Sequence, residues 1–125
     1  GTPARAVNDV REIVAMQLQK CLVDKQCRVT ACSMERREGA EYDFNEPLLE
    51  RLLGTQGYEK KVIVSMLFAG PGRHAGVGGD VAEICQESKR KYPQLETEMT
   101  GLVGSSVCQT VDVLADRYDE VKLKG

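Results

Sequence analysis

The feature that most constrains the fold is a nearly continuous apolar run at residues 61–68 (KVIVSMLF), which leads straight into a glycine-rich segment. A strand that is apolar almost throughout is typical of a parallel sheet covered on both faces. We therefore expect a buried strand at 61–68, followed by a loop at one edge of such a sheet.

Helical and strand patterns alternate on both sides of this run. We expect helices at 4–21, 45–53, 80–92 and from 107 onward, and strands at 27–33, 61–68 and 95–100. Strands that alternate with helices indicate the α/β class, here an open parallel sheet with helices on both faces. Such a unit normally begins with a strand, so we expect a leading strand to be missing from this fragment.

Polar residues mark the expected helix starts. Thr2 before a proline predicts the first N-cap, and Asn45 predicts the second. Asp80 with Glu83 has the spacing of a capping box, as does Ser106 with the glutamine three residues later. The 125 residues contain no internal repeat or linker, which predicts a single domain over 1–125.

Composition excludes several classes of function. The net charge is -2 and there is no Lys/Arg-rich tract, so we expect no nucleic-acid partner. No stretch reaches the roughly 20 apolar residues of a membrane span. The five cysteines include no CxxC pair, which argues against a structural zinc site or a disulfide framework. Reduced thiols predict a cytoplasmic location, or the plastid stroma in a photosynthetic eukaryote.

The loop after 61–68 is the strongest candidate site, because ligands bind at the carboxyl ends of strands in open parallel sheets. It carries the only histidine, His74, whose imidazole can bind a divalent transition metal. Arg73 can pair with a carboxylate, and glycines such as Gly72 let a ligand approach the backbone. The simpler interpretation is that His74 is a solvated loop residue.

Two other loops are expected at the same edge of the sheet. Glu35 follows the strand expected at 27–33 and could face the same cleft as His74. Ser105 and Ser106 could cap the last helix or donate hydrogen bonds to an anionic ligand at its N-terminus. A nucleotide-binding loop is a weaker alternative, since the GxGxxxG spacing of residues 70–76 does not follow the first strand.

The segment 62–84 (VIVSMLFAGPGRHAGVGGDVAEI) resembles the sirohydrochlorin cobaltochelatase/ferrochelatase family, the small class II tetrapyrrole chelatases. His74 matches the metal-binding histidine of that family's glycine loop, and Asp80 matches the acid that opens the next helix. Residues 34–53, with Glu35 at a frequent acidic position, and residues 102–118 also resemble the family. The resemblance thus covers nearly the whole chain.

The sequence departs from the family pattern at two places. The family's first strand ends in a His-Gly-Ser/Thr turn, whose histidine is the other metal ligand, whereas this chain opens with Gly1 and Thr2. The last loop of the family often carries a histidine, and Ser105 and Ser106 stand there instead. The fragment alone is therefore expected to hold one of the family's metal histidines.

The resemblance implies a lyase that inserts Co²⁺ or Fe²⁺ into sirohydrochlorin, in cobalamin or sirohaem biosynthesis, with no organic cofactor. His74 would bind the metal and Glu35 would accept pyrrole protons. Arg73, Gly72, Ser105 and Ser106 would bind the carboxylates of the tetrapyrrole. The family also implies a homodimer or a fused second half. The alternative is a non-catalytic metal- or tetrapyrrole-binding domain, or one half of a two-domain chelatase.

Overall fold

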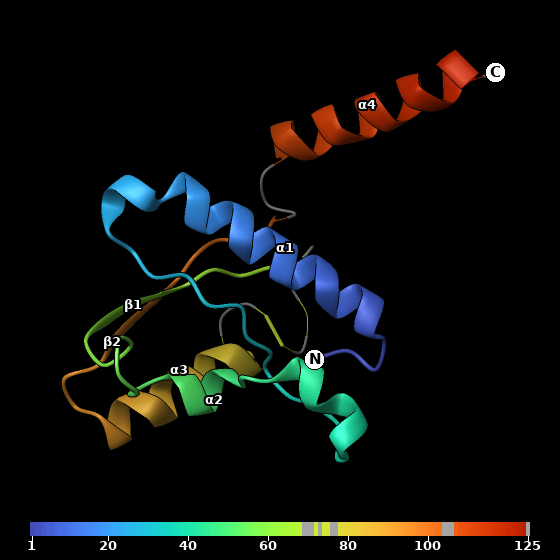
Figure 1. Cartoon of the computed structure of the whole chain (residues 1–125). Helices are drawn as coiled ribbons and strands as arrows, with labels where there is room; N and C mark the ends of the chain where they lie inside the picture. Colours follow the sequence, from blue (N-terminus) through green and yellow to red (C-terminus); the bar gives the residue numbers. More distant parts are fainter. Residues whose placement is uncertain (69–71, 73, 76–77, 104–106, 125) are drawn as a thin grey trace. The chain divides into compact units, whose positions relative to one another are not determined.

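The computed structural model describes residues 1–68, 72, 74–75, 78–103 and 107–124. Its elements, in chain order, are α1 (Arg5–Cys21), η1 (Val23–Lys25), η2 (Ala40–Asn45), α2 (Leu49–Leu52), β1 (Lys61–Val64), α3 (Asp80–Lys91), β2 (Glu96–Met99) and α4 (Val107–Lys124) (Figure 1). The helices predicted at 4–21, 80–92 and from 107 onward are confirmed, as are the strands at 61–68 and 95–100 in shorter form.

The chain divides into two compact units. Unit 1 consists of Gly1–Val62 and Ile84–Thr97, and unit 2 of Ile63–Glu83 and Glu98–Gly125. Each unit is described by itself below, and the single domain over 1–125 remains a prediction.

Strands β1 and β2 form a two-stranded sheet. In unit 1 the amide of Glu96 donates to the carbonyl of Lys60 at 2.7 Å, and in unit 2 the amide of Thr100 donates to the carbonyl of Val64 at 3.0 Å. The residue number increases by four on both strands between these two bonds, so the strands are parallel. The chain is therefore a mixed helix and strand protein with a small open parallel sheet, as the alternating pattern predicted.

Burial along β1 alternates, although the sequence of this strand is apolar almost throughout. Val62, Val64 and Met66 are buried, whereas Ile63 is 64% exposed and Leu67 is 50% exposed. We expected both faces of this strand to be covered. In the structure only the face that carries Val64 is buried. Helices on both faces of the sheet remain a prediction.

The strand predicted at 27–33 is wrong except at its end, where Ser33 forms an isolated parallel bridge with Leu48. The physical reason lies in the side chain of Gln19 on α1. Its Nε2 donates to the carbonyl of Cys27 at 2.7 Å, and its Oε1 accepts from the amide of Val29 at 2.7 Å. One side-chain amide thus bonds two of the backbone groups that a neighbouring strand would otherwise pair with.

The prediction that Asn45 caps a helix is also wrong. The helix begins at Leu49, and Asn45 ends the short helix η2 with only 1% of its surface exposed. Its Nδ2 donates to the carbonyl of Thr2 at 2.8 Å, and its Oδ1 accepts from the amide of Thr2 at 3.0 Å. A buried amide needs both a donor and an acceptor as partners, and the backbone of Thr2 supplies them.

The first helix begins at Arg5, one residue after its predicted start, and its N-cap lies two residues after the predicted one. Its N-cap position is Ala4, which has no side-chain cap bond, and the hydroxyl of Thr2 accepts from the amide of Ala4 at 3.2 Å. The predicted N-cap at Thr2 is therefore wrong in position, because the side chain bonds an amide just before the first turn of α1.

The buried apolar side chains of unit 1 lie in and beside α2, in the segment after it, in β1, in α3 and just before β2; these are Leu48, Leu49, Leu53, Tyr58, Val62, Cys85 and Leu95. By contrast, α4 in unit 2 exposes the apolar side that its spacing predicts, with Val111, Leu114 and Tyr118 all more than half exposed. Within the described part of the chain, no helix has the length and apolarity to cross a lipid bilayer.

Candidate functional site

His74 lies in the segment between β1 and α3 and is tied to the first turn of that helix. Its carbonyl accepts a hydrogen bond from the amide of Val81 at 3.1 Å. A Cβ placed on Gly79 would lie 3.1 Å from the carbonyl carbon and oxygen of His74, closer than most Cβ contacts. Position 79 therefore favours glycine, because the backbone there approaches that of the histidine closely.

The side chain of His74 is held by a carboxylate. Its Nδ1 lies 2.7 Å from Oδ2 of Asp80, the first residue of α3, and both side chains are about one-third exposed. In a neutral imidazole this bond assigns the proton to Nδ1, because an ionised carboxylate only accepts. The lone pair then lies on Nε2, and the carboxylate behind the ring makes that nitrogen a better metal ligand.

The sequence predicted Asp80 as a helix cap, whereas the structure has it as the first residue inside α3, and its contact with His74 was missed. The two residues are only six positions apart, but this spacing does not by itself predict a contact between their side chains. An acidic residue in the first turn of α3 also suits the positive end of the helix dipole. The carboxylate therefore has both a local helical role and a contact with the imidazole.

The other predicted site residues are placed only in part. Gly72 is exposed, donates its amide to the carbonyl of Ala75 at 3.2 Å, and has open space where a Cβ would point. Glu35 is exposed and belongs to unit 1, whereas His74 belongs to unit 2, so their sharing one cleft remains a prediction. Arg73, Ser105 and Ser106 lie outside the described residues.

The described residues contain no cluster of three or more His, Cys, Asp or Glu side chains suited to a metal ion. His74 and Asp80 together provide one imidazole and one carboxylate, which is a pair rather than a cluster of three. The donor chemistry of this pair, an imidazole nitrogen oriented by a carboxylate, suits divalent cobalt or iron.

A buried polar network in unit 1 was not predicted from the sequence. Nη1 of Arg11 donates to the hydroxyl of Ser33 and, at 3.3 Å, to the carbonyl of Asn45. On the same face of α1, Asn8 is 5% exposed, and within the described residues its Oδ1 and the Nε of Arg11 have no hydrogen-bond partner. This network joins α1 to the end of η2 and to the end of the extended segment before it.

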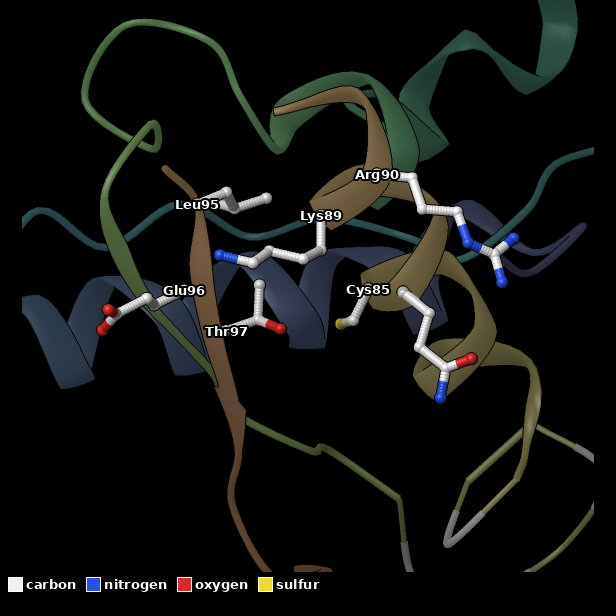
Figure 2. Close-up of a pocket in the computed structure, with 7 residues that line it drawn as sticks. Cys85, Lys89, Arg90, Leu95, Glu96 and Thr97 are labelled. Carbon is white, nitrogen blue, oxygen red and sulfur yellow. The ribbon is translucent and has the colours of Figure 1, made fainter. Parts of the chain in front are cut away.

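Unit 1 also contains an open pocket of about 510 Å³ between α3 and β2 (Figure 2). Leu95, Lys89 and Thr97 line it together with Cys85, whose sulfur faces Thr97 in Figure 2. Burial raises the pKa of the Cys85 thiol, and the hydrogen bond with Thr97 partly offsets this rise. Because the raised pKa keeps the thiol protonated near neutral pH, Cys85 is not a reactive thiolate there.

No protein-family model, curated protein or solved structure matches the chain. A functional conclusion therefore depends on the residues themselves and on the geometry around His74.

Proposed function

We propose that this protein is a sirohydrochlorin chelatase that inserts Co²⁺ or Fe²⁺ into the macrocycle. Two findings support the proposal: the resemblance of the segment 62–84 to that family, and the geometry of His74. The single observation that carries it is the 2.7 Å contact between Nδ1 of His74 and the carboxylate of Asp80. This contact orients an imidazole in the manner common to metal-binding histidines.

In this proposal the metal ion and the tetrapyrrole are both substrates. The ion replaces the two pyrrole N–H protons, so one M²⁺ enters the ring and two H⁺ leave, and charge is balanced. His74 binds the incoming ion through a neutral nitrogen and releases it to the four ring nitrogens. A neutral ligand suits this transfer, because it holds the ion less strongly than a thiolate would.

The remaining roles follow from the resemblance. Glu35 is proposed to accept the protons that leave the ring, as an exposed carboxylate can pass them on to water. Arg73, Gly72, Ser105 and Ser106 are proposed to bind the carboxylates of the substrate. A second copy of the chain or a fused second half is proposed to complete the enclosure of the ring, and the cytoplasm or plastid stroma is the proposed location.

The test is an absorbance assay of sirohydrochlorin with Co²⁺ or Fe²⁺, using the longest natural form of the protein that contains this sequence. His74→Ala and Glu35→Gln are compared with Glu98→Gln, an exposed position of β2 that serves as the control. Wild type and the control should accelerate the spectral change above the rate without protein. His74→Ala should lose most of that acceleration.

A wild-type rate equal to the background with both metals contradicts the enzymatic proposal. If the protein then binds sirohydrochlorin or Co²⁺ without turnover, the non-catalytic binding domain becomes the better interpretation. If His74→Ala keeps the wild-type rate, the proposed role of His74 is contradicted, but the enzymatic proposal is not.

A further inference from the structure

We infer that Asp80 is the positioning residue of His74: it fixes the imidazole as the Nδ1–H tautomer, so that Nε2 is the nitrogen that binds a metal ion. The part about the tautomer stands on the structure alone. The part about the metal rests on the proposed function. No pairing of these two side chains follows from the sequence pattern, in which Asp80 is a helix cap.

The backbone of His74 is bonded to the same helical turn that carries the carboxylate. Asp80 opens α3, and the adjacent amide of Val81 bonds the carbonyl of His74 at 3.1 Å. The backbone and the side chain of His74 are therefore fixed to the same turn of one helix. Gly79, the residue before Asp80, also lies close to the backbone of His74.

This arrangement decides which ring nitrogen can bind a metal. The Nδ1 atom is 2.7 Å from the carboxylate, a distance typical of a charge-assisted hydrogen bond, and in a neutral ring it therefore carries the proton. A protonated ring nitrogen has no lone pair for a metal ion. Metal ligation then falls to Nε2.

A competing explanation is that Asp80 serves only the helix, through its position in the first turn of α3. Two substitutions separate the explanations. Asp80→Asn keeps an oxygen that can accept from Nδ1 but removes the charge. Asp80→Ser keeps a small polar residue in the first turn of α3, but its side chain is one atom too short to keep the same contact.

The first experiment measures the tautomer directly. His74 is the only histidine in the chain, so the imidazole ¹⁵N signals in an NMR spectrum of the labelled protein belong to it without further assignment. At a pH where the ring is neutral and without metal, wild type and Asp80→Asn should show the proton on Nδ1. Asp80→Ser should show a mixture or the proton on Nε2, with the helix content unchanged by circular dichroism.

The second experiment measures metal binding, with Co²⁺ alone as the probe and its visible absorption as the readout. Asp80→Ser should weaken Co²⁺ binding by about 10- to 100-fold, the loss usual when the partner of a metal-binding histidine is removed. Asp80→Asn should lose less, and Glu83→Gln, an exposed position on the same helix, should match wild type.

The outcomes distinguish this inference from the proposed function. A wild-type ring protonated on Nε2, or a tautomer unchanged in Asp80→Ser, overturns the positioning role. An Nδ1–H tautomer that depends on Asp80, in a protein without chelatase activity, supports the inference and contradicts the proposed function. Equal Co²⁺ affinity of wild type and Asp80→Ser overturns the statement that Asp80 directs Nε2 to the metal.

Discussion

Replacing Asn45 by alanine tests whether one buried amide joins the start of the chain to η2. The side chain of Asn45 is 1% exposed and makes hydrogen bonds of 2.8 and 3.0 Å with the carbonyl and the amide of Thr2. Asn45→Ala removes both bonds and leaves a small cavity, while the backbone carbonyl that accepts from Arg11 stays in place.

The expected loss follows from these contacts. Each neutral hydrogen bond contributes about 1 kcal/mol to the free energy of unfolding. Thr2 is only partly buried, so water can replace some of the lost partners and the full cost of two unsatisfied groups does not apply. The loss of the buried amide atoms adds a packing cost. We expect Asn45→Ala to lower the free energy of unfolding by about 2–3 kcal/mol.

Urea denaturation followed by circular dichroism measures this loss. Asn45→Asp retains an oxygen that accepts from the amide of Thr2 but lacks the donor, and it buries a charge, so it should also be less stable than wild type. Glu38→Ala, at an exposed loop position, is the control and should change stability by less than about 0.5 kcal/mol. An equally small change in Asn45→Ala refutes the reasoning, because the bonds to Thr2 then contribute nothing.

Three further predictions follow from burial and close contacts. Leu95 is completely buried, so Leu95→Ala should lower the free energy of unfolding by about 2–5 kcal/mol in the same urea assay, and a loss below 1 kcal/mol would contradict its place in the core. Gly79→Ala should lower the melting temperature and shift the imidazole NMR signals of His74, since the new Cβ would press on the histidine backbone at 3.1 Å, whereas Gly72→Ala, with open space around it, should leave both unchanged. Burial raises the pKa of the Cys32 thiol, with the nearby charge of Arg11 as a smaller opposing effect. The unfolded thiol therefore ionises first, and the stability that this group contributes is complete below about pH 8.5 and is lost as the pH rises through the folded pKa. Urea curves at pH 7.5 and 10 should show a smaller alkaline loss in Cys32→Ala than in wild type, and equal losses would contradict the burial of this thiol.

The sequence alone determined the long helices, the parallel strand pair and the loop that carries His74. These features depend on local signals: the 3.6-residue period of α1, the apolar run that becomes β1, and the acidic first turn of α3. Such signals act over a few residues, and in these elements the tertiary structure does not override them. The position of His74 between β1 and α3 was for this reason predictable, whereas metal binding by His74 remains a proposal.

The tertiary structure alone decided which polar groups pair. Gln19 bonds the backbone of a segment predicted to be a strand, and Asn45 bonds Thr2 across 43 positions rather than capping a helix. The choice of Asp80 as the partner of His74 was settled in the same way, by the fold that brings the first turn of α3 to His74. The physical reason is that a buried polar side chain must find a donor or acceptor, and its partner is whichever group the folded backbone brings within about 3 Å.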